Sequence, residues 1–222
     1  MVENSLSNLK QELEKAEVAG MTRLVQAAAF KDDDTGVHII RVAFLSLEMA
    51  RLVGVPENQC LPLFYASALH DLGKVGISDQ ILQKPGSLTE EEKAVMQRHS
   101  VLGSYFFQSF NSDISKVCYD VILNHHENYD GSGYPNGLRG DDIPFFARIV
   151  SIVDVFDALV MKRCYRDAYS YDEALSMISG SMESKFDPEL LNVFINNIER
   201  LKELHQLISE LGNVKDLFEF YG

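Results

Sequence analysis

Apolar residues recur every three to four positions through most of this chain, which is the spacing of amphipathic helices. The pattern predicts helices at about residues 5–30, 36–53, 57–70, 113–126 and 145–164. No segment alternates strictly between apolar and polar residues, so we expect no β-sheet. The expected fold class is therefore all-α.

Capping residues mark three further helix starts. Residues 89–92 and 170–173 each place Thr or Ser three positions before Glu, which is the capping-box pattern. Asp187 followed by Pro188 predicts the start of a last long helix that runs to about residue 210. Residues 127–144 contain six Gly or Pro and no apolar period, which predicts a long loop.

Composition and charge narrow the classes of partner. The 222 residues are enough to bury one large core. The net charge of −13 argues against a nucleic acid polymer as ligand, because its phosphates require basic surfaces. No apolar run reaches eighteen residues, so we expect no membrane span. The N-terminus lacks a secretory-signal pattern and the three cysteines are scattered, which favours a cytoplasmic location.

Several acidic and imidazole side chains interrupt apolar segments. His70 and Asp71 follow ten uncharged residues, and Asp154 lies between two valines. A buried ionised carboxylate is costly unless it is paired or binds a metal. Four more histidines lie inside or at the edge of apolar segments: His38, His99, His125 and His126. His205, in "LKELHQL", looks instead like a surface residue.

Taken singly, each of these residues has an ordinary explanation as a hydrogen-bonded core histidine or an ion pair. Together, five histidines and two aspartates match the ligand set of a multinuclear nitrogen and oxygen site. Two metals about 3.5–4 Å apart would hold a bridging hydroxide and clamp a phosphoryl centre. Lys74 would neutralise a phosphate oxygen if the helix continues past His70. The alternative for Lys74 is an ion pair with a buried carboxylate.

Six motifs then occur in a characteristic order: "DTGVH", "HDLGK", "RHSVLG", "HHENYDGSGYPNGL", "ARIVSIVDVFDAL" and "FDPEL". Over residues 31–193 the chain resembles the HD-GYP family, a branch of the HD superfamily of metal-dependent phosphohydrolases. The resemblance implies a helical HD-domain bundle with extra C-terminal helices. It also implies a phosphodiesterase in which a metal-bridging hydroxide attacks the phosphorus of cyclic diguanylate (c-di-GMP), yielding linear pGpG and, in many members, GMP.

The resemblance further implies which residues bind metal. One ion would be bound by His38, His70, Asp71 and Asp154, and a second by Asp71, His99, His125 and His126. Asp34 stands where many members carry a glutamate that binds a third ion. The resemblance therefore implies two or three divalent ions, usually iron or manganese.

Substrate contacts are implied in the same way. Gly133, Tyr134 and Pro135 form the family signature in a loop beside the active site, where Tyr134 either contacts a guanine or packs the loop. Arg163 and Arg166 match phosphate-contacting residues, with a surface ion pair as the alternative. Lys74 and Asp71 are the expected catalytic residues.

The expected organisation is a helical extension at 1–30, a catalytic domain at 31–200 and a helical tail at 201–222. The tail either packs back on the domain or supports a homodimer. Two other functions are compatible with the same ligands. One is an HD-type di-iron oxygenase. The other is a catalytically weak signalling module that binds a partner, for example a diguanylate cyclase (GGDEF) domain.

Overall fold

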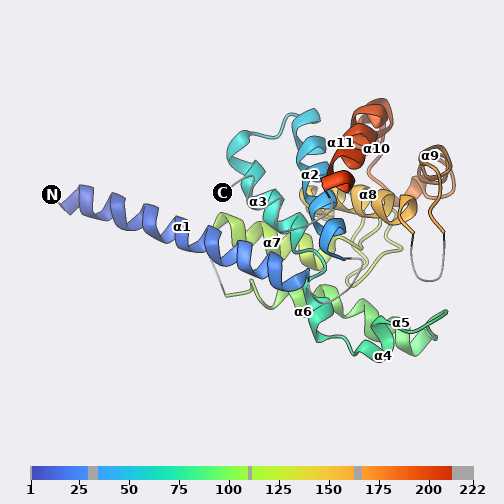
Figure 1. The fold of residues 1–222 in the computed structure, drawn as a ribbon, viewed down its shortest axis with the longest axis horizontal. Coiled ribbons are helices and arrows are strands. Elements are labelled where there is room, and N and C mark those ends of the chain that lie inside the picture. The colour runs from blue at the N-terminus through green and yellow to red at the C-terminus, as the bar shows by residue number, and fades with distance from the viewer. Residues whose placement is uncertain (1, 30–34, 110–111, 163–166, 212–222) are drawn as a thin grey trace.

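The structure is a computed structural model that describes residues 2–29, 35–109, 112–162 and 167–211. Within these ranges every regular element is a helix, which confirms the predicted all-α class (Figure 1). In the same part of the chain, no helix is both long enough and apolar enough to cross a membrane.

Four helices build the core: α2 (Thr35–Leu52), α3 (Glu57–Ala68), α7 (Asp113–Asn124) and α8 (Phe145–Val160). Helix α3 packs against α2 and α7, and α8 packs against α2. Their facing side chains are fully buried, including Leu45, Leu63, Ile122 and Phe156. The N-terminal part of α1 (Val2–Ala28) projects from this body, whereas Met21 and Val25 near its C-terminal end join the core (Figure 1).

The middle of the chain is more broken than the sequence pattern predicts. Helix α3 ends at Ala68, and the chain continues through a 3-10 helix, η1 (Leu72–Gly76), and a short helix that the pattern did not predict, α4 (Asp79–Leu82). The capping box at residues 89–92 is confirmed at the start of α5 (Glu90–Gln97). This helix ends before His99, which is the first residue of a separate helix, α6 (His99–Ser104).

The C-terminal part differs in two further ways. Helix α8 ends at Val160 rather than at 164. A 3-10 helix, η2 (Gly140–Asp142), lies within the predicted loop, and the second capping box is confirmed at α9 (Tyr171–Ser179), which η3 (Glu183–Lys185) follows.

The predicted last helix is in fact two, α10 (Pro188–Asn196) and α11 (Ile198–Leu211). The Asn197 side chain donates to the Val193 carbonyl, 2.8 Å away. Asparagine favours such a local bond over a continuing helix, which accounts for the break. The Asp187 side chain caps α10 as predicted.

Helix α11 packs against α2 and places Leu201, His205 and Ile208 in the interior. The prediction that His205 is a surface residue is therefore wrong: only 3% of it is exposed. Its hydrophilic sequence neighbours face outward, and its own ring faces the core.

Candidate metal centre

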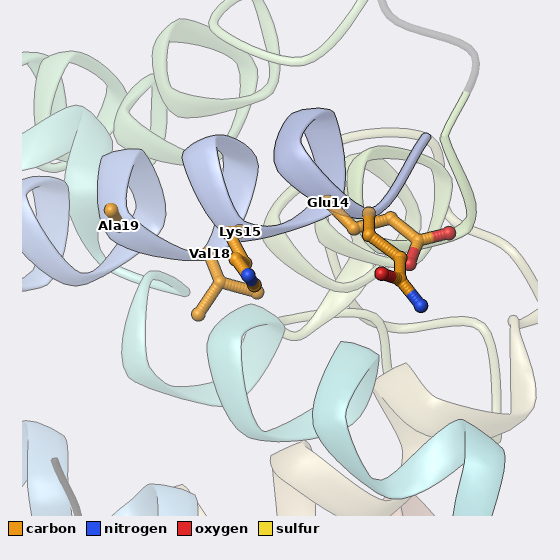
Figure 2. Close-up of a pocket in the computed structure, with 5 residues that line it drawn as sticks. Glu14, Lys15, Val18 and Ala19 are labelled. Carbon is orange, nitrogen blue, oxygen red and sulfur yellow. The ribbon is translucent and has the colours of Figure 1, made fainter. Parts of the chain in front are cut away.

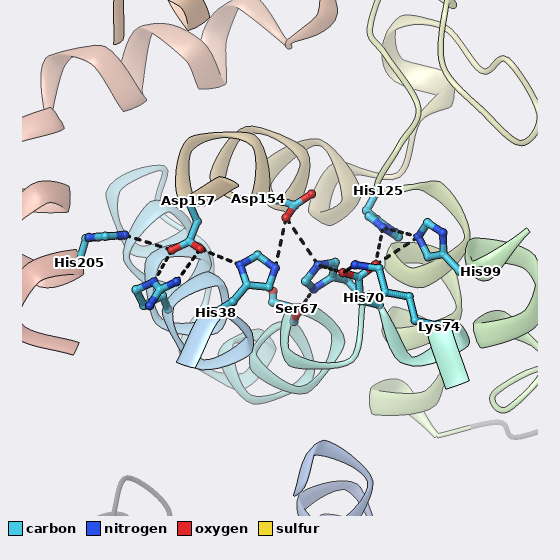
Figure 3. A network of polar contacts seen from close by, with 11 residues as sticks. His38, Ser67, His70, Lys74, His99, His125, Asp154, Asp157 and His205 are labelled. Carbon is cyan, nitrogen blue, oxygen red and sulfur yellow. Dashed lines mark hydrogen bonds and ion pairs between the residues drawn. The ribbon is translucent and has the colours of Figure 1, made fainter. Parts of the chain in front are cut away.

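Seven of the predicted ligands come together from three helices and from the two turns that follow α3 and α7. Figure 3 shows most of this cluster. Within each of two groups the ligand atoms lie within 4.8 Å of one another. The first group comprises His38, His70 and Asp154, and the second comprises Asp71, His99, His125 and His126. Most of these ligands lie at the ends of helices. His70 and Asp71 follow α3, His99 begins α6, and His125 and His126 follow α7.

Asp71 lies between the two groups. Its Oδ2 atom is 3.3 Å from His70 Nε2, and its Oδ1 atom is 3.2 Å from His99 Nε2. Each carboxylate oxygen thus faces a different group, which is the arrangement of a bridging carboxylate. Asp154 Oδ1 completes the first group, 3.5 Å from His38 Nε2 and 3.7 Å from His70 Nε2.

Hydrogen bonds to the far side of the rings fix their orientation. The Nδ1 atoms of His70, His99 and His125 lie 2.7–2.9 Å from the carbonyl oxygens of the residues three positions earlier. A carbonyl only accepts, so each Nδ1 must carry the proton. The Nε2 atoms of His99 and His125 then present lone pairs toward the cluster, as metal-ligating imidazoles do, and that of His70 does so once the ring has lost its second proton.

Two observations show that this donor set suits a cation. His99 Nε2 and His125 Nε2 are 3.3 Å apart, and with both protons on Nδ1 they cannot hydrogen-bond to each other. That separation is what two nitrogens about 2.1 Å from one ion would have. The Nε2 of His70 is fully buried and has no hydrogen-bond partner within the described residues. The chemistry of the donors, imidazole and carboxylate without thiolate, suits iron, manganese or zinc.

The ionisation of the cluster follows from burial and mutual repulsion. Burial, and then the neighbouring histidines, hold the pKa of His125 well below its usual range and lower the pKa of His126 to about 4. Burial also lowers the pKa of His99. At His70 the carboxylates of Asp71 and Asp154 outweigh burial and raise the pKa to about 9. The three imidazoles of the second group are therefore neutral at pH 7, and Asp71, whose pKa is held well below its usual range by Lys74 and the histidines in spite of its burial, supplies a negative charge beside them.

The remaining predicted catalytic and substrate residues are only partly placed. Lys74 Nζ lies 2.5 Å from Asp71 Oδ2, which realises the alternative in which this lysine pairs with a buried carboxylate. Asp71 is the N-cap of η1, and in a 3-10 helix side chains three positions apart lie on the same face. Asp34, Arg163 and Arg166 lie outside the described residues.

The glycine-rich loop at 127–144 is closed over the second group. The buried carboxylate of Glu127 accepts hydrogen bonds from the backbone of Asn136 at 2.7 Å and Leu138 at 3.0 Å. The Tyr134 ring stacks on His126, with centroids 4.7 Å apart and planes 31° from parallel. A Cβ on Gly133 would fall 2.3 Å from the Asn128 nitrogen, so only glycine fits there. Tyr134 thus packs the loop onto a predicted ligand, and Pro135 follows it through a cis peptide bond.

Sequence reasoning missed two buried acids of the site. Glu127 directly follows the paired histidines, and Asp157 lies one helical turn after Asp154 and contacts His38 at 2.7 Å. Both stand within quoted motifs, and their spacing from a predicted ligand is the signal that could have identified them. A hollow lined by Gln11, Glu14, Lys15, Val18 and Ala19 lies along α1 and includes none of the cluster residues (Figure 2).

Comparison with known proteins gives a consistent picture. The sequence model of the HD domain family matches residues 3–190. The "Cyclic di-GMP phosphodiesterase response regulator RpfG" of Xanthomonas campestris is 36% identical over 203 residues, which cover 91% of this chain and 54% of that protein. The "3'3'-cGAMP-specific phosphodiesterase 2" of Vibrio cholerae is 37% identical over 190 residues, which cover 86% of this chain and 36% of that protein.

The chain thus spans about half or less of the length of these curated relatives. Among solved structures, Bd1817, an HDG"Y"P protein from Bdellovibrio bacteriovorus, superimposes with a TM-score of 0.60 at 22% identity. The superposition covers 73% of this chain and 51% of that one, and it supports the fold.

Proposed function

Because this chain belongs to the HD domain family, we propose that it is a metal-dependent phosphodiesterase that hydrolyses a cyclic dinucleotide. The proposal rests above all on Asp71, whose two carboxylate oxygens face two separate groups of imidazole and carboxylate donors. Such a donor set would hold two cations, which together would act on one phosphodiester.

Seven ligands serve the two ions in this proposal. His38, His70 and Asp154 would hold one ion, His99, His125 and His126 would hold the other, and Asp71 would serve both. When bound, the two ions would activate water and neutralise phosphate charge. Iron or manganese are the proposed metals, and a third ion at Asp34 stays a prediction, because that residue is outside the described ranges.

The protein's own side chains orient the substrate and stabilise charge. Lys74 lies at the edge of the cluster with 23% of its side chain exposed, so its ammonium can contact a phosphate oxygen while it pairs with Asp71. An ammonium at that place stabilises the extra negative charge that develops on the phosphoryl oxygens in the transition state. Arg163 and Arg166 remain predicted phosphate contacts. Tyr134 and the backbone of Gly133 and Pro135 form the proposed lip of the site.

The proposed substrate is cyclic diguanylate, cleaved to linear pGpG and then to GMP. The relatives act, by their names, on cyclic di-GMP or on 3'3'-cGAMP. Both ligands present the same two phosphodiesters, so the two-group site serves either, and base recognition decides between them. A GGDEF partner and a homodimer stay predictions.

The direct test is hydrolysis by purified protein loaded with Mn²⁺, or with Fe²⁺ under anaerobic conditions. Cyclic di-GMP and 3'3'-cGAMP are supplied separately and the products are resolved by chromatography. Asp71→Ala should reduce product to background, because both groups lose their shared ligand. Asp120→Asn, on α7 but outside the cluster, should retain wild-type turnover and serves as the matched control.

The rival functions give different results in the same experiment. Oxygen consumption with an organic substrate, without any dinucleotide product, would favour an oxygenase. Stoichiometric metal without turnover of either dinucleotide would favour a partner-binding module. Either outcome contradicts the proposed phosphodiesterase.

A further inference from the structure

A buried carboxylate lies directly behind one of the proposed ligands. Asp157, on α8, is 1% exposed in its side chain. Its Oδ2 atom is 2.7 Å from His38 Nδ1 and 3.0 Å from an Arg41 terminal nitrogen, and its Oδ1 atom is 2.5 Å from Arg41 Nε. Because an ionised carboxylate only accepts, His38 must carry its proton on Nδ1. Its Nε2 atom therefore carries the lone pair, and this atom faces Asp154 in the first group of ligands.

His205, on the C-terminal helix α11, is the third hydrogen-bond partner of the Asp157 carboxylate. His205 Nε2, on α11, lies 3.1 Å from Asp157 Oδ1, and its Nδ1 lies 2.9 Å from the Tyr171 hydroxyl. His205 must therefore donate through Nε2, so in the neutral ring Nδ1 accepts from Tyr171. The result is one directed series of hydrogen bonds from Tyr171 through His205 to Asp157. Figure 3 shows His205, Asp157 and His38 in this order.

The position of α11 makes this contact informative. The match to the HD domain family ends at residue 190, and α11 begins at Ile198. Leu201 and Ile208 already dock the helix through apolar contacts. An apolar side chain would serve that packing as well as histidine, and Arg41 already compensates the charge of Asp157. Packing of α11 therefore does not require a histidine at position 205. The hydrogen bond that His205 donates instead holds the Asp157 carboxylate in place.

We propose that His205 is a positioning residue of the metal centre, which holds Asp157 so that Asp157 fixes the ring and tautomer of His38. This inference rests on the proposed ligand role of His38. Partners behind a metal-ligating histidine typically change metal affinity by about 10–100-fold. His205 acts one residue further out, so we expect an effect near the lower bound of that range.

The test compares Mn²⁺ affinity and thermal stability in three variants. His205→Leu removes the donor and keeps an apolar side chain, and it should weaken the affinity of one Mn²⁺ by about tenfold. His205→Gln retains an N–H donor near the Nε2 position and should restore affinity to within about twofold of wild type. Ile208→Ala, one helical turn away, should lower the melting temperature of the metal-free protein and leave Mn²⁺ affinity unchanged.

Tyr171→Phe provides a second variant in case His205→Leu does not fold. It keeps the ring, which stacks on Phe156 with centroids 6.0 Å apart, and deletes only the hydroxyl. With one peripheral hydrogen bond lost, Mn²⁺ affinity should fall by about threefold while the fold stays intact.

Two results would overturn the inference. One is wild-type Mn²⁺ affinity in both His205→Leu and Tyr171→Phe, and the other is a failure of glutamine to restore what leucine loses. His38→Ala distinguishes a wrong positioning role for His205 from a wrong assignment of the metal centre. If His38→Ala loses one equivalent of metal and the His205 variants keep wild-type Mn²⁺ affinity, only the positioning role is wrong. If His38→Ala binds the full complement, the proposed metal centre is wrong as well.

Discussion

The same buried cluster shifts the pKa values of His126 and His70 in opposite directions. Burial and neighbouring histidines lower the pKa of His126 from 6.5 to about 4, whereas the adjacent carboxylates raise the pKa of His70 to about 9. The difference follows from position: both carboxylates lie within 3.7 Å of His70, whereas His126 lies between the tilted rings of His125 and Tyr134. A cation binding the cluster must therefore displace a proton from His70 but none from His126.

This pair of shifts predicts how stability depends on pH in metal-free protein. Between pH 6.5 and 4 the unfolded chain binds the His126 proton and the folded chain does not, so His126 contributes a loss of stability of about 3 kcal/mol as pH falls. The lowered pKa values of His125 and His99 act in the same direction. The His70 contribution is complete below pH 6.5 and is lost as pH rises through about 9. Urea unfolding after metal chelation should thus show a maximum near pH 6.5.

His126→Gln provides the control for the acid side. It should reduce the loss of stability between pH 6.5 and 4 by the contribution of His126, while the contributions of His125 and His99 and the loss above pH 7 persist. Equal acid slopes in the variant and the wild type would show that His126 is not held neutral in the folded protein.

At the scale of elements, local signals predicted helix starts and missed helix breaks. The capping boxes at 89–92 and 170–173 act within one turn, so the sequence alone reveals them. The break before His99 has a tertiary cause, because η1 lies against the start of α6. A Cβ on Gly73 would fall 1.8 Å from the His99 carbonyl oxygen, a contact that no periodicity can indicate.

Gly73→Ala should therefore destabilise the protein by about 3 kcal/mol or more, since the clash is with backbone and cannot be relieved by a side-chain rotation. Gly76→Ala is the matched control in the same 3-10 helix. There the added Cβ would meet only the flexible Leu102 side chain at 3.1 Å, so the cost should stay within about 1 kcal/mol. Similar losses in urea unfolding for both variants would contradict the close approach of η1 and α6.

At the scale of the whole molecule, the motifs predicted the fold class and the HD-GYP resemblance correctly, and the structure gathers seven of the eight predicted ligands. Prediction failed where a residue's role depends on a distant helix. The charged sequence neighbours of His205 predicted an exposed residue, yet its ring is buried and hydrogen-bonds to Asp157 on α8. Such a contact joins residues 48 positions apart, beyond the reach of local pattern.

Helix α1 offers a test at the same scale. Leu9 and Leu13 are 57% and 62% exposed, whereas Met21 and Val25 are buried in the core. Deleting residues 2–14 should shift the melting temperature by less than about 2 °C and retain metal-dependent activity. Deleting residues 2–25 removes core side chains and should lower it by about 10 °C or more.

The shorter deletion also removes two residues that line the hollow on α1, Gln11 and Glu14. Loss of dinucleotide turnover in a deletion variant that remains folded would place part of the active site on α1, against the present assignment.

The central claim is that two cations lie on either side of Asp71. Anomalous diffraction from crystals of Mn²⁺-loaded protein tests it most directly. We predict two peaks, one among His38, His70, Asp71 and Asp154, and the other among Asp71, His99, His125 and His126. Anomalous density at other side chains only, or none within this cluster, would contradict the account.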